Sequence, residues 1–141
     1  MLVRLIYASR AAAPIDHELV DQILEVSRRN NTAGGITGAL CYCGDVFLQA
    51  LEGSRVEVNR LYGRLQRDAR HGELTLLEYA EIDVRRYPAW SMGKVKLDKV
   101  NLSLLLKYST VPALDPFSVS GKATAAMLEE LLSSAAFVAR D

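Results

Sequence analysis

Residues 38–53 read GALCYCGDVFLQALEG, and this stretch decides the fold. Its two halves, 38–43 and 46–53, are dense in branched, aromatic and small apolar residues, which predicts two strands buried in a sheet. Gly44 and Asp45 alone separate them, a length typical of a two-residue hairpin turn. We therefore expect the two strands to pair antiparallel.

A strand and a helix are predicted before this hairpin. LVRLIYAS at residues 2–9 has the composition of a strand. In the helix that follows, Asp16 is placed to act as the N-cap, and an apolar stripe at helical spacing runs to the breaker NNTAGG at residues 30–35. The connection from the first strand to the second is expected to be right-handed.

A helix and two strands are predicted after the hairpin. Ser54 and Glu57 match a capping box, and the second helix is expected to continue to a turn at His71 and Gly72. LTLLEYAEI and WSMGKVKL then supply the fourth and fifth strands. The order strand-helix-strand-strand-helix-strand-strand predicts a ferredoxin-like α+β sandwich, a five-stranded mixed sheet with two helices on one face.

The chain changes character after residue 97. An apolar, leucine-rich segment, NLSLLLKYS, is followed by a connection with proline and an amphipathic helix expected over about 121–138. We therefore divide the chain into a sheet domain, residues 1–97, and a C-terminal helical extension, residues 98–141. The extension is too short to fold alone, so we expect it to pack on the open face of the sheet or on a neighbouring subunit.

Composition limits the classes of function. The 141 residues carry 17 basic and 17 acidic side chains, so no net charge favours a nucleic-acid partner or an anionic membrane surface. No apolar run approaches the length of about 18 residues that spans a bilayer, and the N-terminus lacks the layout of a signal peptide. We predict a cytoplasmic protein, and the apolar tail favours a homo-oligomer.

The two cysteines, Cys41 and Cys43, alternate along one predicted strand. They project to the same face too near each other for an ordinary disulfide, and they are too few for a zinc site. We interpret them as small core residues and predict no metal site.

Gln49 lies in the middle of a strand whose neighbours are large and apolar. It shares one face with Phe47 and Leu51. Burying an amide without a partner costs about 1 to 3 kcal/mol, so we expect partners for both its carbonyl and its NH2. For Gln49 taken alone, a nearby backbone or side-chain group is the simplest explanation.

More polar groups are predicted to face the same interior. Ser27, Asn30 and Asn31 continue the inward stripe at the end of the first helix, and Tyr7 and Ser9 share the inner face of the first strand. Each has an ordinary structural explanation: an asparagine often caps a helix end in the left-handed conformation, and a half-buried tyrosine is often part of a core.

Together these side chains suggest a small-molecule site. A sheet face with a hydroxyl and an amide, beside a helix with two more amides, suits the C=O and N–H edge of a flat heteroaromatic ring. None of these residues is a good nucleophile or base, and His17 and His71 are the only histidines. We therefore predict a site that binds and responds to a ligand, and no enzyme.

Five motifs together resemble the BLUF family, the blue-light sensors that use FAD. They are RLIYAS, NNTAGGITGAL, VFLQALEG, RDARH and WSM, and the similarity covers about residues 1–97. The tail, including LLLKYS, is similar to the short stand-alone photoreceptors of the PixD-like type.

The resemblance implies noncovalent FAD with its ring between the two helices, against the sheet. Asn31 would bond the flavin C4 carbonyl and N3 edge, Asn30 the C2 side, and Gln49 would lie between Tyr7 and the flavin N5 and C4 oxygen. Residues at the end of the second helix would meet the ribityl and phosphate end. The implied cofactor-binding residues are Tyr7, Ser27, Asn30, Asn31, Gln49, Arg64, Asp68, Arg70 and His71.

The resemblance also implies a mechanism and an output. Light-driven electron and proton transfer from Tyr7 would rearrange the hydrogen bonds of Gln49 and give a reversible red-shifted state. Ser9, Trp90 and Met92 are the implied signal-output residues, with sheet core an equally good explanation of the last two. The implied partner is a separate signalling protein, a response regulator or a cyclic-dinucleotide enzyme.

Two other classes of function remain open on the sequence. A flavin-dependent redox enzyme would use the same cofactor, although no GxGxxG turn for a nicotinamide dinucleotide is present. A cofactor-free assembly module would have the same fold and bind no flavin.

Overall fold

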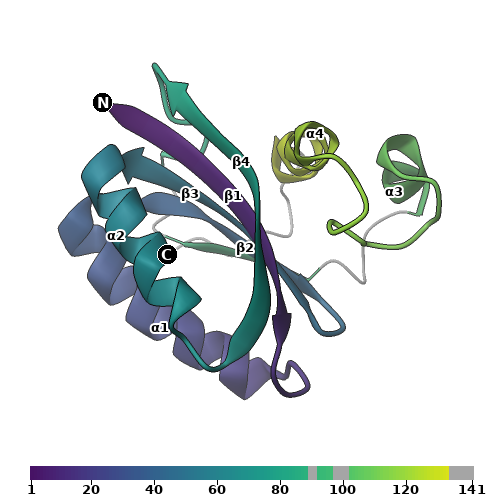
Figure 1. Ribbon diagram of the computed structural model, residues 1–141, viewed down its shortest axis with the longest axis horizontal. Helices are drawn as coiled ribbons and strands as arrows, with labels where there is room; N and C mark the ends of the chain where they lie inside the picture. Colours follow the sequence, from purple (N-terminus) through teal and green to yellow (C-terminus); the bar gives the residue numbers. More distant parts are fainter. Residues whose placement is uncertain (89–91, 97–101, 134–141) are drawn as a thin grey trace.

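A five-stranded sheet is the centre of the computed structural model, which describes residues 1–88, 92–96 and 102–133 (Figure 1). The strands are β1 Leu2–Ala11, β2 Thr37–Cys43, β3 Val46–Ser54, β4 His71–Ile82 and β5 Gly93–Lys96. The helices are α1 His17–Gly34, α2 Arg55–Gln66, α3 Leu102–Tyr108 and α4 Gly121–Ser133.

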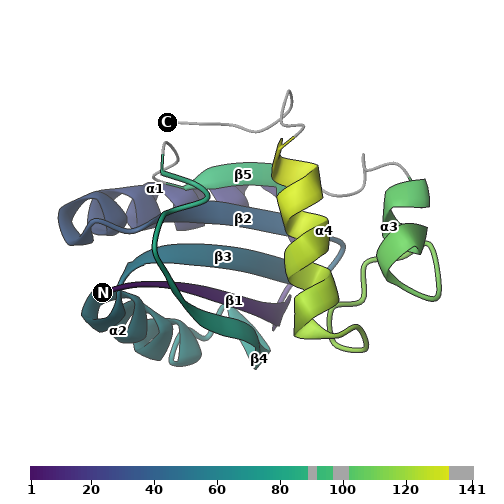
Figure 2. The same cartoon turned by 90° about the horizontal axis from the view of Figure 1, so that it is seen from above.

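The strand order is β4-β1-β3-β2-β5. Neighbouring strands run antiparallel except β2 and β5, which are parallel. Helices α1 and α2 lie on one face of the sheet, and α4 crosses the other face (Figures 1 and 2). The predicted ferredoxin-like α+β sandwich with an added fifth strand is confirmed.

The hairpin at the middle of the sheet forms as predicted. Cys43 pairs with Val46, so Gly44 and Asp45 make the two-residue turn. Gly44 has φ +60°, a left-handed conformation that costs glycine little. Both faces of β3 are buried along Val46–Gly53, which is why its sequence is almost wholly apolar.

The helix starts follow the predicted caps. The Asp16 side chain accepts a hydrogen bond from the backbone N–H of Leu19 at 2.8 Å, and the Ser54 hydroxyl accepts from that of Glu57 at 3.2 Å. Helix α1 ends at Gly35, which takes the left-handed conformation with φ +71°. The left-handed cap is therefore a glycine, and Asn30 and Asn31 lie inside the helix.

The predicted end of the second helix is wrong. Helix α2 stops at Gln66, and His71 already begins β4 instead of forming a turn with Gly72. The reason is pairing with β1, since Ala11 pairs with His71 and Arg10 with Gly72. Of the predicted fifth strand, 90–97, the structure describes residues 92–96, and β5 covers Gly93–Lys96; residues 90, 91 and 97 lie outside the described part of the chain.

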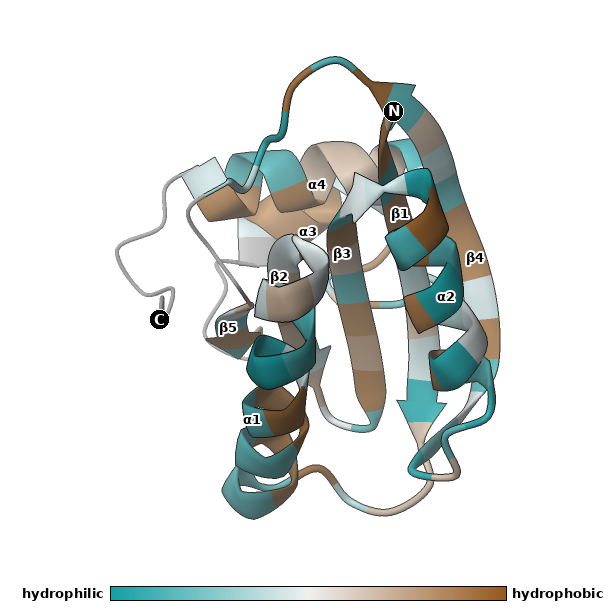
Figure 3. Cartoon of the chain, turned by 90° about the vertical axis from the view of Figure 1, so that its left-hand side faces the viewer, coloured by the Kyte–Doolittle hydropathy of each residue, from teal (hydrophilic) through white to brown (hydrophobic). Residues whose placement is uncertain are grey.

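Two apolar layers form on the two faces of the sheet. The layer under α1 and α2 contains Val3, Leu5, Phe47 and Leu51, whereas the opposite layer contains Ile6 and Leu48. The strand alternation thus gives both faces a core, and in Figure 3 β3 is largely brown while α1 and α2 alternate brown and teal.

The described part of the C-terminal extension contributes a helix to the second face of the sheet. Its last helix buries Ala125, Met127, Leu128, Leu131 and Leu132 there. The start of α4 approaches β4 so closely that a Cβ on Gly121 would lie 1.7 Å from the carbonyl oxygen of Leu77. Helix α3 lies beyond α4, away from the sheet (Figure 2).

Both cysteines belong to this second layer. Cys41 and Cys43 are not joined in a disulfide, and burial raises the pKa of Cys41 to about 12, which keeps that thiol protonated and unreactive. Within residues 1–88, 92–96 and 102–133, no group of three or more metal-ligating side chains comes together. Among the same residues, no helix is long and apolar enough to cross a membrane.

Candidate functional site

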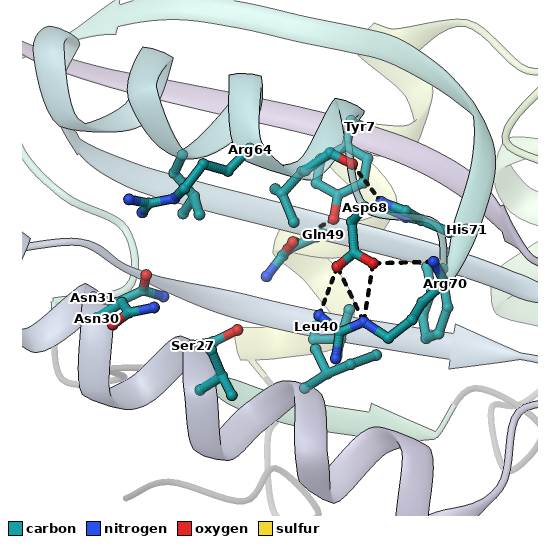
Figure 4. Close-up of a pocket in the computed structure, with 15 residues that line it drawn as sticks. Tyr7, Ser27, Asn30, Asn31, Leu40, Gln49, Arg64, Asp68, Arg70 and His71 are labelled. Carbon is teal, nitrogen blue, oxygen red and sulfur yellow. Dashed lines mark hydrogen bonds and ion pairs between the residues drawn. The ribbon is translucent and has the colours of Figure 1, made fainter.

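A cavity of about 210 Å³ opens between α1 and α2 above the sheet. Figure 4 shows Ser27, Asn30 and Asn31 on α1 facing Arg64 of α2, with Tyr7 and Gln49 on the floor between them. Each predicted ligand-binding residue lines this cavity: Tyr7, Ser27, Asn30, Asn31, Gln49, Arg64, Asp68, Arg70 and His71. The apolar wall, which the sequence could not distinguish from ordinary core, comes from Ile23, Val26, Leu40, Phe47, Leu61 and Leu65.

Tyr7 and Gln49 form the centre of the floor. They occupy opposite positions on the paired strands β1 and β3, and the Tyr7 hydroxyl donates to Oε1 of Gln49 at 2.5 Å. Both side chains are buried. Burial raises the pKa of Tyr7 above its ordinary range, and nearby Tyr62 and Asp68 add to the effect. The hydroxyl therefore remains a donor through the neutral range.

The other end of the Gln49 amide has a weaker partner. Its Nε2 donates to the sulfur of Met92 at 3.3 Å, and Met92 is fully buried. A thioether is a poor acceptor compared with a carbonyl or a carboxylate. Gln49 is thus held firmly at its oxygen and loosely at its nitrogen, an arrangement that lets the nitrogen change partner at small cost.

Asn31 carries the clearest sign of a missing ligand. Its side chain is 1% exposed, yet neither Nδ2 nor Oδ1 has a hydrogen-bond partner within the described part of the chain. Such a group costs about 1 to 3 kcal/mol unless something else satisfies it. Because Asn31 lines the cavity, a bound ring with adjacent C=O and N–H groups fits this donor and acceptor pair.

The mouth of the cavity is charged. The Arg70 guanidinium binds the Asp68 carboxylate, with Nη2 to Oδ2 at 2.6 Å, and this interaction lowers the pKa of Asp68. Arg64, in the last turn of α2, has no ion-pair partner among the residues that the structure describes. A cation so placed suits an anionic group at the cavity entrance.

His71 lines the cavity but has both ring nitrogens engaged by the protein. Its Nε2 lies 2.7 Å from the carbonyl oxygen of Leu65, and its Nδ1 lies 2.7 Å from the hydroxyl of Ser9. Because a carbonyl only accepts, Nε2 carries a proton, and in the neutral ring the Ser9 hydroxyl donates to Nδ1. His71 therefore presents ring carbons, and no free nitrogen, to the cavity.

The pairing of Ser9 with His71 was not predicted, and neither was a contact to the backbone of Met92. The guanidinium of Arg28 on α1 donates to the Met92 carbonyl, from Nη2 at 3.0 Å and from Nε at 3.3 Å. Nothing in the spacing of these residues indicated either contact. Of the predicted output residues, Ser9 and Met92 are both buried at this site, and Trp90 lies outside the described residues.

The site as a whole is suited to a flat heteroaromatic ring. Its floor offers a hydroxyl and an amide, the α1 wall offers the Asn31 amide, which has no partner among the described residues, and apolar side chains line much of the rest below the charged mouth. The cavity is small for a drug-sized ligand, which ordinarily needs about 300 to 1,000 Å³. The cavity therefore fits a ring that is enclosed by the protein, and a polar substituent of that ring would extend to the charged mouth.

A sequence profile of the BLUF family, described as sensors of blue-light using FAD, matches residues 2–93. Photoactivated adenylate cyclase subunit beta of Euglena gracilis is 34% identical over 92 residues, which make up 64% of this chain and 11% of that protein. The chain thus corresponds to a small part of this relative.

Two solved structures match over almost their whole length. BlrB, described as a BLUF protein in its dark state, is 31% identical with a TM-score of 0.79, and the match covers 94% of this chain and 96% of BlrB. BlsA in its photo-activated state is 30% identical with a TM-score of 0.81, and the match covers 94% and 95% of the two chains. These likenesses confirm the resemblance that the five sequence motifs indicate.

Proposed function

Because the chain belongs to the BLUF family, whose domains are light-sensing flavin modules and not enzymes, we propose that it is a blue-light photoreceptor that binds FAD noncovalently. One observation carries the proposal. The buried 2.5 Å hydrogen bond from Tyr7 to Gln49 lies in the same cavity as the unpaired amide of Asn31. Tyr7 is a redox-active group whose proton can move to Gln49, and the Asn31 amide offers a place for a ring to bind.

We propose that the α1 amides hold the ring. Asn31 is buried and unpaired, so it suits the C4 carbonyl and N3 edge, and the neighbouring Asn30 suits the C2 side. Arg64 and the Asp68–Arg70 pair, at the charged mouth, suit the ribityl and phosphate end. Ser27 completes the α1 side of the cavity.

The proposed photochemistry uses Tyr7 and Gln49. Bound flavin supplies the absorption of blue light and an acceptor for one electron and one proton. Tyr7 gives up the electron, and its proton leaves along the hydrogen bond to Gln49 Oε1. Gln49 has a donor and an acceptor on one planar group, so a rearrangement exchanges the donor and the acceptor that its neighbours contact. Once the electron and the proton have returned to Tyr7, the rearranged Gln49 amide would donate to the ring carbonyl, and this hydrogen bond would give a red-shifted state that reverts in the dark.

We propose that residues 1–97 sense light and that 98–141 pass the signal to a separate protein. Helix α4 covers the face of the sheet opposite the cavity, and the exposed Leu106 and Val111 lie on or next to α3. Such a surface suits a protein partner, with a response regulator or a cyclic-dinucleotide enzyme as candidates, or a second copy of this chain.

Replacing Tyr7 by Phe tests this function. The variant should retain flavin and lose the light-induced red shift, because the ring stays in place while the proton donor is gone. Tyr62→Phe is the matched control, since its ring lies 5.7 Å from that of Tyr7, and it should keep the shift. A normal shift in Tyr7→Phe contradicts the mechanism. Mass spectrometry of the released flavin distinguishes FAD from FMN.

A further inference from the structure

Met92 is held at two points by two different elements. Its sulfur accepts the Gln49 amide at 3.3 Å, and its carbonyl oxygen accepts two N–H groups of Arg28 at 3.0 and 3.3 Å. Gln49 lies in β3 and Arg28 in α1, so Met92 connects the cavity floor to the helix that carries Ser27 and Asn31.

The backbone of Met92 needs this support because the strand after it is short. Within the described residues, strand β5 comprises the four residues Gly93–Lys96, lies at the edge of the sheet and pairs with β2 (Figure 2). The ladder begins where Gly93 pairs with Ala39, so Met92 lies just before it and has no strand partner. A residue beyond the end of a short edge strand is held by few backbone hydrogen bonds, and its neighbours must supply the rest.

Arg28 supplies a strong attachment at this point. A guanidinium presents several N–H groups in a fixed planar fork, and hydrogen bonds from a charged donor are about twice as strong as neutral ones. The attachment on the other side, from Gln49 to a thioether sulfur, is weak. Arg28 thus fixes the position of the Met92 backbone, and this places the Met92 sulfur within reach of the Gln49 amide.

We propose that Arg28 is a positioning residue for the photocycle: it fixes Met92 so that the sulfur receives the Gln49 amide, and so sets how fast Gln49 returns to its dark arrangement. The inference rests on the proposed function. To return to the dark arrangement, Gln49 Nε2 must re-form its hydrogen bond to the Met92 sulfur. If Arg28 already holds Met92 by its carbonyl, the sulfur is in place and the bond re-forms faster.

A second link between the same two elements provides a control. Lys94 Nζ in β5 lies 3.5 Å from Asp21 Oδ1 in α1, in an ion pair whose lysine is half-buried and whose aspartate is exposed. If Arg28 merely ties α1 to β5, then breaking the Lys94–Asp21 pair should act in the same direction. If Arg28 acts through Met92, Asp21→Asn should leave the photocycle unchanged.

The test measures dark recovery in the full chain with bound flavin for Arg28→Ala, Arg28→Lys and Asp21→Asn. We expect recovery to slow roughly tenfold or more in Arg28→Ala, as losing the charged donor of the Met92 carbonyl, with its two hydrogen bonds, predicts. Arg28→Lys should restore part of the rate, and Asp21→Asn should recover as the unaltered protein does. In a Met92→Leu background, which keeps the carbonyl and lacks the sulfur, Arg28→Ala should change the rate little further.

A second readout follows Met92 directly and needs no light. The chain has three methionines, so carbon-13 labelling of their methyl groups gives three NMR signals, and Met92→Leu identifies the one from Met92. Arg28→Ala should shift or broaden that signal and leave the signal of Met127 in place. If Arg28→Ala fails to fold, Arg28→Gln and Arg28→Lys make the same comparison with smaller changes.

Two results would overturn the inference: unchanged recovery with an unchanged Met92 signal in Arg28→Ala, or an equal slowing of recovery with and without the Met92 sulfur. Failure of the proposed function looks different, because the unaltered protein would then show no red shift. In that case the NMR comparison still decides whether Arg28 positions Met92.

Discussion

Tyr7 and Gln49 lie directly opposite each other on paired strands, and the tyrosine hydroxyl donates a 2.5 Å hydrogen bond to the amide oxygen across the pair. A hydrogen bond between cross-strand neighbours is held by the whole ladder of β1 and β3, which extends from Leu2 with Ser54 to Arg10 with Val46. The Tyr7–Gln49 pair is therefore held rigidly, whereas the second partner of Gln49, Met92, lies just before the edge strand β5.

Replacing Asn31 by Leu should have opposite effects on the flavin-free and flavin-bound protein. The flavin-free protein should become more stable by about 1 kcal/mol or more, because a buried, unpaired amide is removed. Flavin affinity should fall roughly tenfold or more, because the ring loses a donor and an acceptor. Chemical denaturation of both forms and flavin titration measure these effects. Unchanged affinity would show that Asn31 does not hold the ring.

Replacing Glu52 by Gln should lower the free energy of unfolding substantially. The Glu52 carboxylate is fully buried and binds Arg4 at 2.8 Å, together with the backbone N–H groups of Arg86 and Tyr87. Removing its charge leaves Arg4 buried without a counter-ion, which costs about 3 to 5 kcal/mol.

Two further variants control for the Glu52 experiment. Glu25→Gln breaks an exposed pair with Arg29 and should change the free energy of unfolding by less than about 0.5 kcal/mol. Replacing Arg4 by Met together with Glu52 by Gln should recover much of the loss, because the buried cation is gone and the amide oxygen can still accept from the backbone N–H groups of Arg86 and Tyr87. Urea denaturation measures all three, and a Glu52→Gln protein as stable as Glu25→Gln would contradict the expectation.

Gly121→Ala should displace α4 from the sheet. An added methyl group would lie 1.7 Å from the backbone oxygen of Leu77, which no side-chain movement can relieve. We expect a loss of about 1 to 3 kcal/mol of stability and faster proteolysis near α4. Gly63→Ala, where the methyl group meets a flexible arginine at 3.7 Å, should instead stabilise α2 by about 0.5 to 1 kcal/mol. Equal thermal midpoints for the two variants would refute the close packing.

The red shift should persist as the pH is raised from about 7 to about 10, because burial keeps the pKa of Tyr7 above its ordinary value. The free energy of unfolding should depend on pH in a higher range than this. Above about pH 10, an unfolded Tyr7 loses its proton while the folded one keeps it, so the folded state binds more protons and the free energy of unfolding falls with rising pH. Denaturation at several pH values should show a shallower fall in Tyr7→Phe. An identical slope in both proteins would contradict this assignment.

Strand alternation was enough to predict the floor and one wall of the site. Because Gln49 alternates with apolar residues in a strand buried on both faces, its amide had to lie among them, and Tyr7 and Ser9 followed from the same rule in β1. The asparagines at the end of α1 were predictable from helical spacing. Local rules of this kind need no knowledge of the tertiary structure.

The contacts that were missed depend on the register between distant segments. His71 was assigned to a turn because Gly72 follows it, whereas pairing with β1 draws both residues into β4. The same pairing brings His71 to Ser9, 62 residues away, and the parallel pairing of β5 with β2 brings Met92 to Arg28, 64 residues away. No spacing rule links residues so far apart, so these contacts were not predictable from one sequence.

The most direct test of the central claim is the visible spectrum of the purified, flavin-bound protein, recorded in the dark, directly after blue illumination and during recovery. A rearrangement of Gln49 beside the ring predicts a small shift of the whole flavin spectrum to the red that reverts in darkness without any added oxidant. A bound flavin whose spectrum does not shift, or that bleaches and recovers only with an oxidant, would contradict the claim.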